Sequence, residues 1–482
     1  MAASDFGQHT ARFLDWFKKL PGATFHDAVR IVDLRERGAG RGIVATADIP
    51  PDTVLFTIPR AAILSSATAP LFARRPPSTL NLDAALGDLD LDLDLDRHDA
   101  WTALILALLH EHLRGADSPW KPYLDVLPPP GAFDTPLHWT LAELAHLQAS
   151  PVVGRVGRED ADALIRRQIV PVVRQHADLF AGSGALGDEE LVRLAHRVGS
   201  TIMAYAFDLD AEEDAEDEED EEGWVEDREG RSSLGMVPMA DILNADAEFN
   251  AHINHGQEAL TATALRRIAR GEEVLNYYGP LGNGELLRRY GYVTEKHARH
   301  DVVELPWALV ATEMRKLLGL DEHDWQQVAA HMDPDAFEDG FVLDRDGDEP
   351  DATGALRGEA AFQALPEGLW AQFTDLLKAV KKVRPAAVEA LPGKKEREAA
   401  YFDTVAGALR ACEAQYPTSL EEDQELLAGG DVDRRQRMAI WVRLGEKKLL
   451  REAQRWVQSQ LAGLHAAGEP DGEPSAKRQR RR

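Results

Sequence analysis

The segment between residues 236 and 293 constrains the fold of this chain more than any other part. It places Asn244 after an apolar run, then a strand that follows a glycine turn and ends in Tyr277 and Tyr278, and then a third tyrosine at Tyr290. The segment contains no metal-ligand set, no nucleophile elbow and no phosphate-binding loop. Phenols and amides between apolar strands suit a reaction that needs a shaped channel more than a strong base, such as methyl transfer to an amine.

Length and composition indicate a protein of two domains. The chain has 482 residues, of which 44% are hydrophobic, enough for two sizeable cores. No apolar stretch approaches the roughly 18 residues of a membrane span, and the N-terminus lacks the regions of a secretion signal, so we expect neither membrane insertion nor secretion. The single Cys412 cannot form an intrachain disulfide, which fits a reducing compartment and excludes a cysteine–zinc cluster.

The histidines show no metal-binding spacing. His110 and His112 stand two residues apart in a predicted helix, which points their rings in different directions. No HExxH sequence occurs, so we expect no bound metal.

The chain is strongly acidic. Its formal net charge is -29, and residues 208–222 carry 12 acids and no base. Such a surface repels the phosphates of nucleic acids and favours basic protein partners, although solubility alone would also explain the charge.

Hydrophobic periodicity divides the chain into successive parts. A helical segment over residues 1–24 precedes a β-rich unit over residues 25–300. The β-branched runs IVATA and TVLFTI predict two strands, a helical insertion follows over about residues 97–207, and strands resume before the run GEEVLNYYG. Residues 301–465 read almost throughout as amphipathic helices, which predicts an all-helical second domain.

Three polar segments predict irregular structure. The Asp-Leu repeat at residues 88–96 would crowd carboxylates on one face of a strand, so a flexible insert is favoured over a strand. The acidic run at 208–222 is predicted as a solvated loop that steers basic substrates, and residues 466–482 as a disordered basic tail. The tail ends in KRQRRR, which predicts the nucleus, with the cytoplasm as a further location; the alternatives are a tail without a role or one that folds back onto the acidic loop.

Four motifs in order carry a family resemblance: GAGRG at residues 38–42, PMADILN at 238–244 with Phe249 and Asn250 after it, GEEVLNYYG at 271–279 and NGELLRRYGYV at 283–293. With the helical insertion, they resemble the SET-domain protein methyltransferases, and most closely the subgroup of the Rubisco large-subunit and ribosomal-protein lysine methyltransferases. The resemblance implies an α+β protein. We expect a β-rich SET domain with a pseudoknot and a helical insertion, followed by an all-α domain that binds the substrate.

The resemblance also implies a cofactor, a substrate and a set of site residues. The cofactor is S-adenosylmethionine, and the substrate is a lysine of a basic protein, ribosomal or histone-like. Tyr278 is the expected catalytic tyrosine, and Trp120 is expected on the substrate side. The residues expected at the cofactor are Ala39, Gly40, Arg41, Tyr205, Asn244, Ala245 and Tyr290.

Several of these residues have plainer interpretations. Tyr278, Tyr205 and Trp120 could be core aromatics, and Tyr290 a helix-packing residue. Asn244 could cap a turn. Arg41 could pair with the cofactor carboxylate or be a solvated surface arginine.

The chain departs from the family pattern at one position, because Ala245 stands where histidine usually follows the motif asparagine. If that histidine acts through its main chain, alanine is tolerable, and this is the interpretation we favour. A catalytically silent SET-like binding module, or a methyltransferase for another nucleophile such as histidine, are the alternatives. The sequence leaves the oligomeric state open, with a monomer as the expectation.

Overall fold

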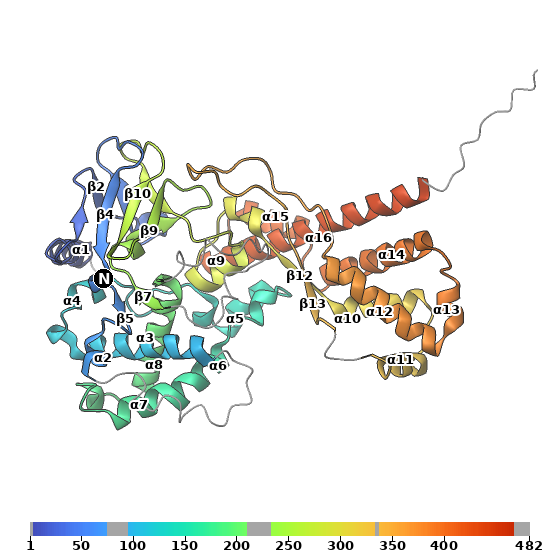
Figure 1. Cartoon of the computed structure of the whole chain (residues 1–482), viewed down its shortest axis with the longest axis horizontal. Coiled ribbons are helices and arrows are strands. Elements are labelled where there is room, and N and C mark those ends of the chain that lie inside the picture. The colour runs from blue at the N-terminus through green and yellow to red at the C-terminus, as the bar shows by residue number, and fades with distance from the viewer. Residues whose placement is uncertain (1–2, 75–94, 210–232, 333–336, 467–482) are drawn as a thin grey trace, which may run out of the picture.

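The computed structural model describes residues 3–74, 95–209, 233–332 and 337–466. Two lobes lie side by side (Figure 1): the N-terminal lobe carries most strands and the helical insertion, and the C-terminal lobe is mostly helical. The last helix, α16 (Arg434–Ala466), packs on α9 (Asn283–Tyr290) of the first lobe and on α14 (Lys394–Glu413) of the second. The predicted α+β class is confirmed.

Three small sheets form the β-structure of the N-terminal lobe. The first has the order β1 (Thr24–Phe25), β4 (Val54–Pro59), β10 (Ala259–Ala264), β9 (Ala251–His255). The second has the order β2 (Val29–Asp33), β3 (Arg41–Ala45), β11 (Glu273–Asn276), β8 (Asn244–Ala245). The third has the order β5 (Leu64–Ser65), β7 (Leu234–Met236), β6 (Ala206–Asp208).

One-sided burial explains the register of the first sheet. In β10 the side chains of Leu260, Ala262 and Ala264 are buried, whereas Thr261 and Thr263 between them are partly exposed. A shift of one residue would turn this apolar face to solvent, so the alternation holds β10 in place between β4 and β9.

A parallel pairing joins the motifs PMADILN and GEEVLNYYG. Asn244 lies opposite Leu275, and Ala245 opposite Asn276. The fully buried Asn250 extends this contact, because its Oδ1 accepts from the main chain of Leu275 at 2.8 Å and its Nδ2 donates to the carbonyl of Glu273 at 2.8 Å. The motif asparagine therefore lies beside the strand that leads into Tyr277 and Tyr278.

Helices occupy the predicted insertion. They are α3 (Leu95–Arg114), α4 (Lys121–Leu124), α5 (Leu141–Leu144), α6 (Arg158–Leu164), α7 (Val170–Gln175) and α8 (Asp188–Tyr205). The short helix α2 (Pro70–Arg74) precedes the insertion. The first turn of α8 contains three acids, which suit the positive end of a helix dipole. This helix ends at Tyr205 and leads directly into β6.

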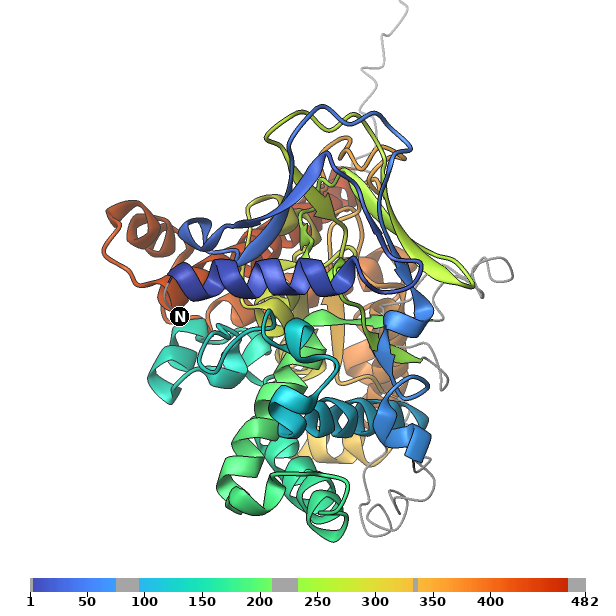
Figure 2. The same ribbon diagram turned by 90° about the vertical axis from the view of Figure 1, so that its left-hand side faces the viewer.

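Helix α1 (Ala3–Phe17) confirms the predicted N-terminal helix and packs against α4 and β2. It lies across the front of the N-terminal lobe in Figure 2, between the sheets above it and the helices of the insertion below.

The C-terminal lobe corrects the expectation of an all-helical domain, because it also contains a two-stranded sheet of β12 (Val303–Pro306) and β13 (Gly340–Leu343). Val303 and Leu305 alternate with Glu304 and are buried, but a run of four residues gives too short a pattern for prediction. Its other helices are α10 (Trp307–Leu317), α11 (Glu322–Ala329), α12 (Glu367–Val383), α13 (Pro385–Glu389) and α15 (Leu420–Gly429).

Some predicted segments lie outside the described residues. These are the Asp-Leu repeat up to residue 94, the acidic run from residue 210 and the tail from residue 467. Within the described ranges, no helix is both long and apolar enough to cross a membrane.

Candidate active site

The GAGRG motif forms the turn between β2 and β3. Gly38 and Gly40 have φ angles of +78° and +71°, a region that favours glycine. The turn is closed by a main-chain hydrogen bond of 2.7 Å from Leu34 to the carbonyl of Gly40. A Cβ atom on Gly40 would meet no heavy atom within 4 Å, so a ligand can approach the main chain there.

Asn244 connects this turn to the neighbouring strand. Its Nδ2 donates to the carbonyl of Arg41 at 3.1 Å and to Oε1 of Glu273 at 2.7 Å. The structure therefore brings Asn244, Ala245 and the GAGRG turn together, as the sequence predicted. The side chain bridges two segments rather than capping a turn.

Gly42 is the glycine that this packing requires. A Cβ atom there would lie 2.5 Å from Cδ1 of Leu34, 2.8 Å from Oε1 of Glu273 and 2.9 Å from Nδ2 of Asn244. All three distances are shorter than real side chains tolerate, and two of the three atoms belong to the Asn244–Glu273 hydrogen bond.

We expect Gly42→Ala to weaken cofactor binding about tenfold and to cost about 1–3 kcal/mol of stability, because overpacking displaces Asn244. Calorimetric titration with S-adenosylmethionine and urea unfolding measure the two effects. Gly199→Ala is the matched control, since a Cβ atom in that helical position meets nothing within 4 Å. Equal results for the two variants would contradict the prediction.

The side chain of Arg41 is engaged within the protein. Its guanidinium donates to the carbonyl of Val126 at 2.8 Å and to Oγ1 of Thr10 at 3.0 Å, and it lies 3.9 Å above the ring of Phe6. Burial lowers its pKa to about 10. The side chain is therefore not a solvated arginine, and its pairing with a cofactor carboxylate stays a prediction. Arg41 belongs to the site through its carbonyl, which Asn244 binds.

Tyr278 lies at the centre of an aromatic cluster. Its hydroxyl donates to the carbonyl of Leu243 at 2.8 Å, and its ring stacks on Tyr290 with 4.7 Å between centroids. Burial raises its pKa well above the usual range, and Tyr292, Tyr290 and Tyr205 act in the same direction. The phenol is therefore neutral near pH 7, so it does not act as a base there.

The end of α9 places the other two tyrosines. Gly291, with φ +74°, ends the helix and donates to the carbonyl of Leu286 at 3.1 Å. Tyr290 thus occupies the last helical position against Tyr278, and Tyr292 follows with its ring 6.3 Å from Tyr290. The hydroxyl of Tyr292 is buried and has no hydrogen-bond partner among the described residues.

A buried carboxyl lies beside this cluster. Oδ2 of Asp241 accepts from the hydroxyl of Tyr123 at 2.5 Å, and its Oδ1 is buried without a partner in the part of the chain that the structure describes. Burial raises the pKa of Asp241 to about 7. Tyr205 is close enough for the charge of Asp241 to act on it, and burial with that charge raises its pKa to about 12.

Sequence reasoning missed Tyr123, Asp241 and Tyr292. Asp241 stands three positions before Asn244 in the motif PMADILN, and an acid within an apolar run is the signal that could have identified it. Tyr292 stands two positions after Tyr290. Tyr123 carries no local signal, since its partner is 118 residues away.

Trp120 is a core residue, as the plainer interpretation of the sequence predicted. It is 8% exposed and packs with ring centroids 5.7 Å from Trp16 of α1 and 6.2 Å from Tyr123. It therefore reaches the cluster only through Tyr123, and its contact with a substrate stays a prediction. Over the described ranges, no group of three or more acidic, histidine or cysteine side chains could hold a metal ion.

Two family models match this chain. The model described as the SET domain matches residues 40–279, and the one described as Rubisco LSMT substrate-binding matches residues 359–450. The chain is 32% identical over 305 residues to ribosomal lysine N-methyltransferase 4 of Saccharomyces cerevisiae, which covers 62% of this chain and 58% of that protein. It is 28% identical over 432 residues to the human N-lysine methyltransferase SETD6, which covers 86% and 84%. The matched part spans little more than half the length of the first curated relatives.

Solved structures share the fold over nearly the whole chain. The crystal structure of the SET domain of LSMT bound to lysine and AdoHcy has a TM-score of 0.60 at 18% identity, covering 95% of this chain and 93% of that one. The structure of Rubisco LSMT bound to AdoMet has a TM-score of 0.59 at 19% identity, with the same coverage. At sequence identities of 18% and 19%, the similarity to these structures shows the fold alone.

Proposed function

The chain belongs to the SET-domain proteins that carry a Rubisco LSMT-type substrate-binding domain, and from this we propose that it is an S-adenosylmethionine-dependent protein-lysine N-methyltransferase. Its substrate is a basic protein, ribosomal or histone-like, and it acts as a monomer. The observation that supports the proposal is a single cluster of these residues. Tyr278 stacks on Tyr290 and donates to the carbonyl of Leu243. The next residue, Asn244, donates to the carbonyl of Arg41 in the GAGRG motif.

The reaction needs a neutral lysine. S-adenosylmethionine, when bound, would supply the methyl group to the amine nitrogen, with the electrons of the carbon–sulfur bond staying on sulfur and the extra proton of the amine leaving to water. A free lysine has a pKa of about 10.4, so forming the neutral amine at pH 7 costs roughly 4.6 kcal/mol. An apolar channel reduces this cost because burial disfavours the ammonium, and S-adenosylmethionine supplies a sulfonium methyl group whose charge also repels it.

Tyr278 would orient the amine. Its only proton is donated to Leu243, so its oxygen lone pairs remain to accept a hydrogen bond from the amine. The stacked ring of Tyr290 restricts its rotation. Fixing the nucleophile in this way can remove several kcal/mol of barrier without a base.

The site contains groups that fit the cofactor. The main chain is accessible at Gly40, and Oδ1 of Asp241 and the hydroxyl of Tyr292 are buried polar atoms without partners among the described residues. Buried polar atoms of this kind are normally satisfied by a ligand or water. Residues 38–42, Asn244 and Tyr290 would hold the cofactor, and Tyr205 would complete the wall.

Ala245 is the feature that favours a silent binding module. Its main chain nevertheless pairs with Asn276 in the parallel ladder, a position that does not depend on the side chain. Calorimetric titration with S-adenosylmethionine separates the two functions, since an enzyme must bind the cofactor and a silent module need not.

Incubation of the purified chain with labelled cofactor and a ribosomal-protein extract tests the activity, with mass spectrometry to locate the mark. A mark on lysine supports the proposal, whereas a mark on histidine alone assigns the alternative nucleophile. Cofactor binding without any labelled protein, in this and in a histone extract, would contradict the proposed substrate class.

A segment that we name the acidic strap, residues 344–361, supports a basic substrate. The strap leaves β13 and crosses to the N-terminal lobe, where the carbonyl of Gly354 accepts from Phe249 at 3.0 Å. Phe249 stacks on Tyr277 with 4.7 Å between centroids, next to Tyr278 in the chain. Four acids of the strap between β13 and this contact are exposed: Asp344, Asp346, Asp348 and Glu349.

We expect the triple variant Asp344→Lys, Asp346→Lys, Asp348→Lys to raise KM for a basic substrate roughly tenfold with little change in kcat, and the effect to shrink at high salt. Steady-state kinetics at two salt concentrations measure this. The control carries the same charge change at exposed acids elsewhere on the N-terminal lobe: Asp15→Lys, Asp178→Lys and Glu258→Lys. Equal KM values in the two triple variants would show that only net charge matters.

The basic tail, outside the described residues, places the protein in the nucleus and secondarily in the cytoplasm. Residues 466–482 fused to a fluorescent reporter should concentrate it in the nucleus, and the same fusion with KRQRRR replaced by glutamines should not. An even distribution of both reporters would reject nuclear import.

A further inference from the structure

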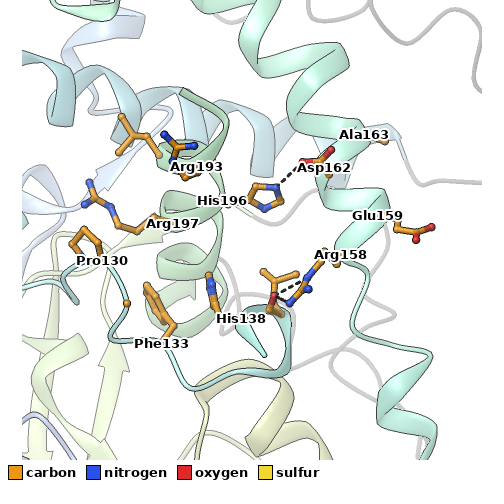
Figure 3. Close-up of a pocket in the computed structure, with 13 residues that line it drawn as sticks. Pro130, Phe133, His138, Arg158, Glu159, Asp162, Ala163, Arg193, His196 and Arg197 are labelled. Atoms are coloured by element: carbon orange, nitrogen blue, oxygen red, sulfur yellow. Dashed lines mark hydrogen bonds and ion pairs between the residues drawn. The ribbon is translucent and has the colours of Figure 1, made fainter. Parts of the chain in front are cut away.

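A cavity of about 870 Å³ opens between the 3-10 turn Pro136–His138, α6 and α8 (Figure 3). Its size is that of a small-molecule site, and none of the residues assigned above to the cofactor or to catalysis lines it. Cationic side chains outnumber acids in its lining. The cations are Arg158, Arg193 and Arg197, the acids are Glu159 and Asp162, and the imidazoles of His138 and His196 lie among them.

None of the three arginines is ion-paired. Arg158 donates to the carbonyls of Leu137 and Trp139, the latter at 2.7 Å, which are uncharged acceptors. The guanidinium groups of Arg193 and Arg197 have no hydrogen bond or ion pair with any described residue. Arg193 is only near Glu189, whose carboxylate pairs with another arginine.

The two acids do not neutralise these charges. Asp162 is already shared between Arg166, at 2.7 Å, and His196, at 3.2 Å. Glu159 projects away from the other labelled side chains (Figure 3) and is exposed. The cavity therefore has a positive potential inside a protein whose net charge is -29.

Two groups in the lining have lowered pKa values, and burial is the largest cause for both. Burial lowers the pKa of His138, and the charges of His196, Arg158 and Arg435 lower it further. Burial also lowers the pKa of Arg197. Arg197 is half-buried without a counter-charge among the described residues, which is unfavourable, and Arg158 and Arg193 are exposed beside it. An anion that entered the cavity would be stabilised by all three.

One wall of the cavity is aromatic. Phe133 and His138 stack with 5.5 Å between centroids and 18° between ring planes, and Pro130 and Leu137 add apolar surface nearby. A planar or apolar group can pack against such a wall while its charged end meets the guanidiniums.

We propose that this cavity binds a small ligand that bears an oxyanion, with Arg193 and Arg197 binding the phosphate or carboxylate and the Phe133–His138 pair packing against its apolar part. The two arginines stand four residues apart on α8, so they project from the same face of the helix. Guanidinium groups bind such oxyanions through paired hydrogen bonds. This site is independent of the proposed methyl transfer.

Calorimetric titration of the full chain with inorganic phosphate, phenyl phosphate and phenol tests the site. Both phosphates should bind, phenyl phosphate roughly threefold tighter than inorganic phosphate because of the aromatic wall, and phenol should not bind. The double variant Arg193→Gln, Arg197→Gln should weaken both phosphates about tenfold or more. Arg167→Gln removes the same kind of charge from an exposed position outside the cavity and should leave binding unchanged.

Proton NMR of His138 gives a second readout that does not depend on heat. Phosphate should raise the pKa of His138 in the parent protein and in Arg167→Gln, but not in the double variant, because only a bound anion offsets the neighbouring cations. No binding of either phosphate at millimolar concentration, or equal binding in the parent and the double variant, would overturn the proposal. Equal affinity for the two phosphates would overturn the role of the aromatic wall.

Discussion

Tyr278→Phe should lower the rate of lysine methylation by about 100-fold or more while leaving cofactor affinity within a few-fold of the parent, because misplacing a reacting group costs on this scale. The variant keeps the ring, so the stacking on Tyr290 at 4.7 Å remains. It removes the hydroxyl that Leu243 holds in position at 2.8 Å. Single-turnover reactions with saturating labelled cofactor measure the rate, and calorimetry measures the affinity.

Tyr277→Phe is the matched control, because its hydroxyl makes only a 3.5 Å contact with Glu349 of the acidic strap. Loss of the Tyr277 hydroxyl should change the rate of methylation by no more than a few-fold. Full activity in Tyr278→Phe, or an equal loss in both variants, would remove the positioning role from Tyr278.

The pH profile provides an independent check. The pKa of Tyr278 is raised well above its usual range by burial, so this phenol should not titrate between pH 6 and pH 9. The parent rate should therefore rise with pH as the substrate amine loses its proton, and Tyr278→Phe should show the same slope at a lower level. A slope that flattens in the variant alone would mean that the phenol accepts a proton.

Short-range patterns in the sequence predicted the parts of the fold that depend on them. The alternation in residues 259–264 predicts the one-sided burial of β10, and the β-branched run at residues 53–58 becomes β4. The order of the four motifs predicted that Asn244, Tyr278 and the GAGRG turn would meet, and the parallel pairing of β8 with β11 brings them together.

The parts that sequence reasoning missed depend on distant partners. Asp241 is a buried carboxyl to which Tyr123, from the insertion, donates a hydrogen bond. The guanidinium of Arg41 is directed inward by Val126 and by Phe6 of α1, and neither contact has a local pattern. Hydrophobic periodicity predicts which face of a helix or strand is buried, but it does not predict which polar group of another element contacts that face.

The second large effect concerns stability, and it arises where the C-terminal helices meet the N-terminal lobe. Asp423 of α15 is fully buried and accepts from Nη2 of Arg443 at 2.6 Å and from Nζ of Lys447 at 2.6 Å. Both cations come from α16 and are themselves buried. Arg443 also donates to the carbonyl of His146, so the network links the two lobes.

We expect Asp423→Ala to lower the free energy of unfolding by about 3–5 kcal/mol, since it leaves two buried cations without a counter-charge. Asp375→Ala is the control: Asp375 pairs with Lys378 at 2.7 Å, but the two side chains are 56% and 71% exposed, so its loss should cost less than about 1 kcal/mol. Urea unfolding of both variants, followed by circular dichroism, measures the difference. If the two variants unfold alike, the attraction between these buried charges is no stronger than at the surface, and the contact between the lobes must depend on apolar packing instead.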